Sequence, residues 1–490
     1  MPSPQLSKIR AAAVDGRLVN PIYRQTQLKN LHDALSKAAT QIEAVLSADS
    51  PDSRPVDIRL EVRLALRLLA ETATAVAPEQ ALKDEYAVAR GQDFAAGRQP
   101  YGVVVIEDVA PHAFFYGLIA ALAPAIAEGN VVVVKVKGNS LLQTPTAVFD
   151  LVRAALDKDI FAVVPELDAE DLGHRHLRVV QNSGGSSSPA SPIPTLSSDS
   201  SLRTVAIVER DADIQAAADA LVAARFSLGG RSPYAPDLVL VNEWVKRDLI
   251  IALSASSARF MADAKSSSSS KSSSVAAKAV EEGSATIISS NPAATVVDVS
   301  GRDSALLKSK IAEPCLVLHS VTSMDDAIDT APRHGTLAAA YIFTKPDAAK
   351  YIGQFVDAHI IFVNQLPPQI LFMPVAPAGH ALNLSTTTTT TSSATTSPYT
   401  TSLFSLPKPQ FITTSPLTRT VAAIMANPHS TAVVLDPKAL PAVKRLKNRL
   451  ALGFFEQGIV TGGVLLLSVV LSCTGYLGWV AVRAVRTRLL

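Results

Sequence analysis

A turn near the middle of the chain has the composition of a segment that presents a reactive side chain. In the stretch RFSLGGRSPYAPDLVLV, residues 225–241, a glycine pair and Ser232 precede an apolar strand that runs from Leu238 to Val241. Loops positioned by a rigid sheet commonly carry binding and catalytic residues. The hydroxyl of Ser232 is the nucleophile that this turn offers, although a serine reacts only when a neighbouring base activates it.

The composition excludes several other kinds of site. The chain has 490 residues, of which 48% are hydrophobic and 18% are charged, and its net charge is +2. This length allows two or three domains, and the near-neutral charge gives no indication of nucleic-acid binding. Cys315 and Cys473 lie far apart, so neither a disulfide framework nor a cysteine metal site is expected. Residues 1–18 lack the apolar core of a secretory signal, which predicts an intracellular protein.

Hydrophobic periodicity predicts helices at the N-terminus and a parallel sheet after them. In residues 27–47 and 57–75, leucine, isoleucine and valine recur at spacings of three and four, which is typical of amphipathic helices. Residues 100–109 then form a β-branched run, FFYGLIAALAPAIAEGN an apolar helix that ends at Gly129, and residues 131–136 a second buried strand. A strand, a helix and a strand in this order predict a parallel α/β sheet.

Polar segments interrupt the predicted pattern further along the chain. Residues 146–157 are expected to form a helix and residues 177–185 a strand with its turn, but the serine- and proline-rich run that follows cannot continue as a helix. A strand and a helix return in residues 203–226. Two low-complexity inserts, at 265–274 and 385–397, are too polar to be buried and are expected to be loops.

The C-terminal region contains a segment that fits a transmembrane helix. Residues 459–482, IVTGGVLLLSVVLSCTGYLGWVAV, are 24 consecutive residues without a charge, enough to cross a hydrocarbon core of about 30 Å. Basic residues flank the segment, and Tyr476 and Trp479 lie towards one end, where aromatic side chains favour the interface. A buried core helix is the alternative. We expect a single-pass tail anchor in the endoplasmic reticulum, peroxisomal or mitochondrial outer membrane, with the bulk of the protein in the cytosol.

Several motifs, in the same order along the chain, resemble those of the aldehyde dehydrogenase superfamily. They cover residues 25–415 and include Pro100-Tyr101-Gly102-Val103-Val104, Ala125-Ile126-Ala127-Glu128-Gly129-Asn130, Val133-Val134-Lys135, Ala235-Pro236-Asp237, Tyr341-Ile342-Phe343-Thr344 and Phe362-Val363-Asn364. The Ala-Pro-Asp motif is most similar to the class 3, fatty aldehyde branch, in which a hydrophobic C-terminal tail also occurs.

The resemblance implies an aldehyde dehydrogenase-like α/β fold with a C-terminal transmembrane helix. A helical lead-in is expected over residues 1–99, a Rossmann-like cofactor domain with a parallel sheet over 100–215, and a catalytic-type α/β domain over 216–370. A returning segment that usually pairs two subunits is expected over 371–450, before the anchor at 459–482.

In this family a cysteine thiolate attacks the aldehyde, an asparagine and a backbone amide stabilise the oxyanion, and hydride passes to NAD or NADP. Lys135 matches the family lysine on the adenosine ribose, with a solvent-exposed strand-end lysine as the alternative. Gly184 and Gly185 match the turn that receives the pyrophosphate. Lys310 stands where the family has the glutamate that binds the nicotinamide ribose, so cofactor binding is expected to be weak.

The catalytic positions implied by the resemblance are not matched. The nucleophilic cysteine falls on Pro233, one residue beyond the hydroxyl of Ser232. Pro111 or His112 takes the place of the oxyanion asparagine; His112 would donate a hydrogen bond there, and a surface histidine is the alternative. The general-base glutamate aligns near Asp199, for which a simple loop aspartate is the alternative. No metal ligand is expected.

Two functions compete on this inventory. The first is a membrane-anchored homologue without classical aldehyde oxidation, which binds or scaffolds as a homodimer or as a heterodimer with a related dehydrogenase. The second is an active NAD(P)-dependent enzyme that oxidises long-chain aliphatic aldehydes to carboxylic acids. The missing residues favour the first.

Overall fold

The computed structural model describes residues 4–51, 53–94, 97–136, 143–167, 172, 175–185, 193–262, 274–291, 294–331, 335–382, 397–407, 412–428, 435–436, 438–442 and 454–488. The chain divides into two compact units, one of residues Met1–Lys345 with Phe355–Thr413 and the other of residues Pro346–Gln354 with Thr414–Leu490. All the strands lie in the first unit. The low-complexity inserts predicted at 265–274 and 385–397 lie outside the described residues, except for the last residue of each.

The first unit begins with helices, as the leucine spacing predicts. Asn20 caps the second of them, because its side chain accepts a hydrogen bond from the Ile22 backbone N–H at 2.9 Å. The prediction of one helix over residues 27–47 is wrong at Ala38, where the chain leaves one helix and enters the next. The elements are α1 (Pro4–Val14), η1 (Arg17–Val19), α2 (Pro21–Lys37), α3 (Ala39–Asp49), α4 (Pro55–Ala75) and α5 (Pro78–Ala89).

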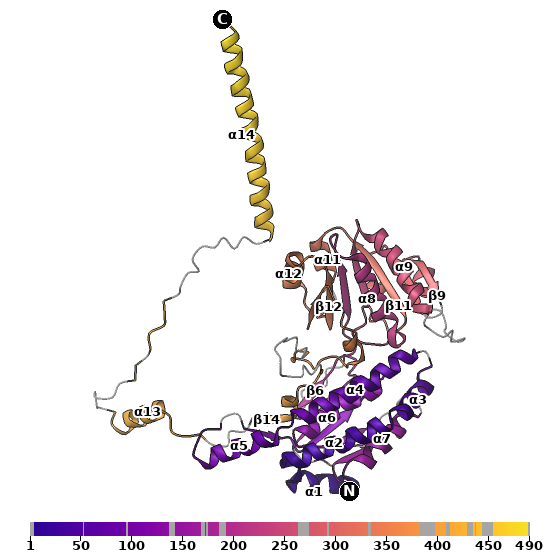
Figure 1. Ribbon diagram of the computed structural model, residues 1–490, viewed down its shortest axis with the longest axis vertical. Helices are drawn as coiled ribbons and strands as arrows, with labels where there is room; N and C mark the ends of the chain where they lie inside the picture. The colour runs from indigo at the N-terminus through magenta and orange to yellow at the C-terminus, as the bar shows by residue number, and fades with distance from the viewer. Residues whose placement is uncertain are drawn as a thin grey trace. The chain divides into compact units, whose positions relative to one another are not determined.

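A five-stranded, all-parallel sheet follows, with the strand order β4-β3-β2-β5-β6. The predicted strand–helix–strand unit at its centre is confirmed, and every residue of its helix α6 is buried. Helix α4 packs against α6, and α2 packs against both (Figure 1). The elements are β2 (Val103–Glu107), α6 (Phe114–Ala127), β3 (Val131–Lys135), α7 (Thr144–Ala155), β4 (Phe161–Val164), β5 (His176–Val180) and β6 (Thr195–Ser197).

A seven-stranded sheet carries the order β13-β12-β7-β8-β11-β10-β9, in which only β9 and β10 pair antiparallel. Its strand β7 lies before residue 215, so the two sheets separate earlier than the expected domain boundary. The strands are β7 (Thr204–Val208), β8 (Leu238–Asn242), β9 (Ala285–Asn291), β10 (Ala294–Val299), β11 (Cys315–Val321), β12 (Ala339–Phe343) and β13 (Ile361–Val363). The helices are α8 (Ile214–Phe226), η3 (Ser227–Gly230), α9 (Lys246–Ala262), α10 (Ser274–Glu281), η4 (Ala305–Leu307) and α11 (Met324–Thr330).

The returning segment of the first unit forms a separate two-stranded sheet with the chain before β2. Strand β14 (Ser405–Pro407) pairs antiparallel with β1 (Arg98–Pro100), and two short helices, η5 (Pro368–Phe372) and η6 (Thr401–Phe404), precede it. The second unit contains α13 (Pro416–Ala426), α14 (Phe454–Arg488) and most of α12 (Pro346–Phe355).

Helix α14 contains the segment that the sequence analysis singles out as a membrane span. Within it, Gln457–Arg486 is 30 residues long with a mean hydropathy of 1.9, and none of its most apolar window is buried. In the described part of the chain it is the one helix long and apolar enough to cross a membrane.

Candidate functional site

A cavity of about 330 Å³ lies at the carboxyl edge of the five-stranded sheet. Its walls come from the loops that follow β2, β5 and β6, from the turn between η3 and β8, from the loop before β11, and from the segment after η5. Ligands of parallel sheets bind at this edge, because the loops after the strands converge there. The described lining residues are three prolines, two cations, one histidine and six others: Pro111, Pro233, Pro374, Arg231, Lys310, His112, Gln181, Asn182, Ser200, Ala110, Ile311 and Ala312.

The cavity therefore joins three places that the resemblance assigns to catalysis or cofactor binding. By the resemblance, Pro233 is expected at the nucleophile position, Pro111 or His112 at the oxyanion position, and Lys310 at the nicotinamide ribose position. These residues are far apart in sequence, and only the fold brings them to one cavity. Neither cysteine lines it: Cys315 is fully buried at the start of β11, and Cys473 lies in α14.

The turn that precedes Pro233 is built by a strained backbone. Leu228, Gly229 and Gly230 all have positive φ angles, of 54°, 62° and 72°. Glycine is required at 230, because a Cβ there would lie 2.5 Å from the backbone oxygen of Glu313. Asp57 holds the turn from the helical side by accepting a hydrogen bond from the Leu228 N–H at 3.2 Å.

The hydroxyl of Ser232 does not line the cavity, although both of its neighbours do. Ser232 is 1% exposed, and its Oγ accepts a hydrogen bond from the Tyr234 N–H at 3.3 Å. That hydrogen bond joins two residues of the same turn. The structure thus gives Ser232 a hydrogen-bond partner within its own turn and, among the described residues, no base.

The side chain of Lys310 is bonded to the turn at residues 231–237, which carries Pro233. Its ammonium group donates to the backbone oxygen of Pro233 at 2.6 Å and to Oδ2 of Asp237 at 2.9 Å. Burial lowers the pKa of Lys310, and the attraction of Asp237 opposes this shift. Sequence reasoning identified the charge reversal at Lys310 but missed that this lysine fixes the position of Pro233.

His112 is buried, so its interpretation as a surface residue is wrong. Its Nε2 lies 3.2 Å from the backbone oxygen of Met373, and a carbonyl only accepts, so this nitrogen carries the proton. Burial, together with the charges of Arg231 and Lys310, lowers the pKa of His112 to about 3. A neutral ring whose one N–H is already used by Met373 cannot also donate to an oxyanion.

Gln181 holds the loop that carries His112 against α6. Its side-chain oxygen accepts from the Ala110 N–H at 3.1 Å, and its amide group donates to the Gly117 backbone oxygen at 2.8 Å. The motif search gave no signal for this residue, because its role depends on two partners that are distant in sequence. Gln181 thus positions the loop that carries His112 through both ends of its side-chain amide.

The expected cofactor residues lie at the same sheet edge but do not line the cavity. Lys135 ends β3, and its side chain makes no hydrogen bond or ion pair with any described residue. Gly184 and Gly185 have positive φ, of 56° and 76°, and a Cβ on Gly185 would lie 2.8 Å from Oγ of Ser201. Asp199 accepts from the backbone N–H and the hydroxyl of Ser201, at 2.8 and 2.6 Å. This contact fits the alternative of a loop aspartate.

Lys310, at the position expected to bind the nicotinamide ribose, does not fit that half of a dinucleotide. A carboxylate accepts hydrogen bonds from ribose hydroxyls, whereas the Lys310 ammonium only donates and is already engaged by Pro233 and Asp237. Lys135 remains available for the adenosine half. Within the described ranges, no group of three His, Cys, Asp or Glu residues is placed to hold a metal ion.

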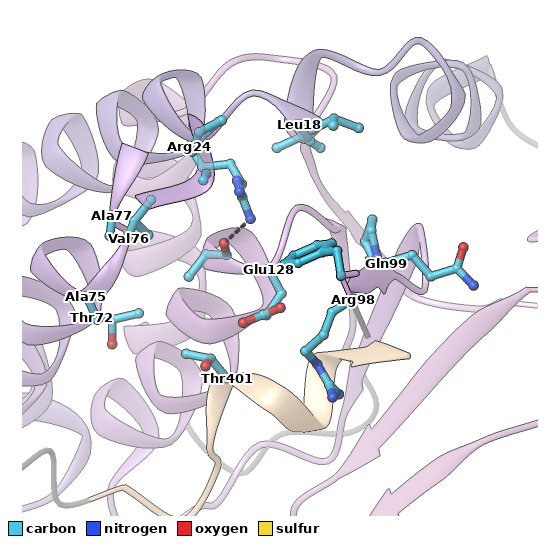
Figure 2. A pocket seen from close by; sticks show the side chains of 16 residues that line it. Leu18, Arg24, Thr72, Ala75, Val76, Ala77, Arg98, Gln99, Glu128 and Thr401 are labelled. Carbon is cyan, nitrogen blue, oxygen red and sulfur yellow. Dashed lines mark hydrogen bonds between the residues drawn. The ribbon is translucent and has the colours of Figure 1, made fainter. Parts of the chain in front are cut away.

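A second cavity, of about 340 Å³, lies at the opposite, amino edge of the same sheet. Figure 2 shows Arg24 reaching across it to the backbone oxygen of Ala127, at 2.5 Å, with Glu128 and Arg98 nearby. Burial lowers the pKa of Arg24, and Glu128 opposes this shift. None of the candidate catalytic or cofactor residues named from the sequence lines this cavity, and ligands of parallel sheets bind at the other edge.

Comparison with known proteins agrees with the fold. A sequence model described as the aldehyde dehydrogenase family matches residues 6–376. A search of curated proteins finds no match.

Solved structures show the same architecture. AldH of Staphylococcus aureus in a substrate-bound state is 18% identical, with a TM-score of 0.64, and the match covers 84% of this chain and 94% of that one. A gamma-glutamyl-gamma-aminobutyraldehyde dehydrogenase from Burkholderia cenocepacia is 18% identical, with a TM-score of 0.61 and coverages of 74% and 80%. An indole-3-acetaldehyde dehydrogenase in complex with NAD+ is 17% identical, with a TM-score of 0.59 and the same coverages. At these identities the likeness concerns the fold.

Proposed function

The chain belongs to the aldehyde dehydrogenase family, and we propose that it is a member without the family's aldehyde oxidation, acting as a membrane-anchored binding or scaffolding protein. The observation that carries this proposal is the cavity in which Pro233 takes the nucleophile position. Thiol chemistry requires a thiolate beside the aldehyde carbon. Neither cysteine lines this cavity.

The other groups of the cavity do not replace the missing thiol. The Ser232 hydroxyl is buried against the backbone of its own turn, and Asp199 is held by Ser201. His112 is neutral, and its N–H is bonded to the Met373 carbonyl. An alkoxide forms from serine only with an adjacent base, and no such base lies beside Ser232 among the described residues.

The proposed membership of the fatty aldehyde branch rests on two features. One is Asp237 in the Ala-Pro-Asp motif, and the other is the apolar helix α14 at the end of the chain. In this proposal the first unit binds and α14 anchors, and the segment 371–450 pairs with a second copy or with a related dehydrogenase. The alternative, an active NAD(P)-dependent enzyme for long-chain aldehydes, is favoured by the same anchor and by Lys135.

The proposal predicts that the purified full-length protein oxidises no aldehyde, from short-chain to fatty, with NAD or NADP. The expected rate is that of a mock preparation, because no activated nucleophile faces the cavity. The measurement is the absorbance of the reduced cofactor across an aldehyde panel, for the wild type and for Ser232→Ala. Turnover above the mock preparation that disappears in Ser232→Ala would contradict the proposal and make Ser232 the nucleophile.

We also predict weak dinucleotide binding. Lys310 removes the acceptor for the nicotinamide ribose, so we expect millimolar dissociation constants for NAD and NADP, or about 4 kcal/mol of binding. Calorimetric titration of the full-length protein in lipid nanodiscs measures this, with empty nanodiscs as the blank. A micromolar dissociation constant that is lost in Lys135→Ala would show that the adenosine half alone suffices and that the cofactor expectation is wrong.

A further inference from the structure

The cavity that holds Pro233 is positively charged. Arg231 and Lys310 line it, and none of its described lining residues is a carboxylate. His112 is neutral and adds no charge of either sign. The remaining walls are largely apolar, since three prolines, two alanines and Ile311 contribute to them.

The residues behind the cavity wall strengthen this excess. Asp237, which is 1% exposed, is the partner of both Arg225 and Lys310. Arg203 is buried close by and donates to the backbone oxygens of Leu307 and Ala331 at 2.5 and 3.0 Å. Arg203, Arg225 and Lys310 therefore surround Asp237, and Glu313 adds a second negative charge near Arg225, so cations outnumber carboxylates in this cluster by three to two. In such a poorly hydrated region an uncompensated positive charge favours the entry of an anion.

Three of the lining residues keep donor groups without a described partner. Two of the three N–H bonds of Lys310 are used, by Pro233 and Asp237. Arg231 uses Nε for Leu228 and Nη2 for Ser53, and its Nη1 makes no hydrogen bond to any described residue. The hydroxyl of Ser200 donates to the side-chain oxygen of Asn182. The side-chain amide nitrogen of Asn182 has no hydrogen-bond partner among the described residues.

We propose that this cavity binds the carboxylate of an aliphatic acid, with Lys310 and Arg231 holding the anion and the prolines contacting the chain. The inference rests on the proposed function of a binding protein, because a cavity without a nucleophile binds a ligand and releases it without a reaction. The volume of about 330 Å³ lies at the lower end for small-molecule sites. A guanidinium and a carboxylate form a charge-assisted, often bidentate pair. An uncharged aldehyde of equal length gains no such pair, so the acid binds more tightly.

The test is calorimetric titration of octanoate into full-length protein in nanodiscs of zwitterionic lipid, with empty nanodiscs as the blank. We expect saturable binding of octanoate that is at least tenfold tighter than binding of octanol, which has the same chain without the charge. Equal binding of octanol would overturn the proposed ion pair. Displacement of octanoate by an equal concentration of inorganic phosphate would overturn the assignment to an aliphatic acid.

Variants locate the site. Arg231→Gln and Lys310→Met should each weaken octanoate binding about tenfold or more, whereas Lys308→Met, an exposed lysine two residues away, should leave it unchanged. Lys310 also supports Asp237, so circular dichroism and thermal unfolding accompany its variant, and Arg231→Gln tests the site without touching that support. Unchanged binding in Arg231→Gln would overturn the proposal.

The same preparation separates this inference from the proposed function. Cofactor-dependent turnover of octanal would contradict the proposed function and would leave a positive octanoate titration standing. Absence of saturable octanoate binding, in a protein that also shows no turnover, would overturn the carboxylate site alone.

Discussion

Replacing Asp237 with alanine is expected to lower the free energy of unfolding of the first unit by about 3–5 kcal/mol, the cost of removing one partner from a buried ion pair. Its Oδ1 accepts from the Ile311 N–H at 3.0 Å, and its Oδ2 accepts from the Thr204 N–H at 2.8 Å and from Lys310 at 2.9 Å. Arg225 lies 3.5 Å away and is fully buried. Without Asp237, the fully buried Arg225, the partly buried Lys310 and two backbone N–H groups each lose one partner.

Urea unfolding, followed by circular dichroism, measures this loss. Asp303→Ala is the matched control, because that aspartate is exposed, and it should change the free energy of unfolding by less than about 0.5 kcal/mol. Combining Asp237→Ala with Lys310→Met should recover part of the loss, since one of the unpaired charges is then gone. A single Asp237→Ala variant as stable as Asp303→Ala would show that Asp237 does not hold this region.

The second large effect concerns the C-terminal helix. Full-length protein is expected to sediment with membranes and to remain there after alkaline carbonate extraction, whereas a chain that ends at Arg449 should stay in the supernatant. The reason is the apolar surface of Gln457–Arg486, which the fold leaves unburied. Large exposed side chains on it include Leu465, Leu466, Leu467, Val469, Val470 and Leu471. Immunoblotting of the two fractions measures the distribution.

A matched variant tests whether the apolar span is the cause. The double variant Leu466→Arg, Val470→Arg, near the middle of the span, should be released into the carbonate supernatant. Each central charge costs about 2.5–3.5 kcal/mol on insertion. Leu435→Arg, outside the span, should not be released. Release of the unmodified full-length protein by carbonate would contradict membrane insertion.

Much of the fold was readable from local patterns. The β-branched runs became β2 and β3, the apolar segment between them became the fully buried α6, and the uncharged C-terminal segment lies in α14. These elements carry strong periodic or continuous apolar signals, which report directly on burial. The break at Ala38 and the strand β6 within a serine- and proline-rich run carried no such signal. β6 forms because β5 offers it a parallel partner.

The candidate site divides in the same way. The sequence alone determined which residue types stand at the candidate positions, a proline at 233 in the turn and a lysine at 310 before β11, and these follow from order along the chain. Only the tertiary structure decided where their side chains point. The Ser232 hydroxyl accepts a hydrogen bond from the backbone of its own turn, and the buried His112 ring is bonded to the Met373 carbonyl. The Lys310 ammonium group donates to Pro233 and Asp237. Side-chain direction depends on partners that are more than seventy residues away for Lys310. Local propensity contains no information about such contacts, because they form only when the sheets and loops are assembled.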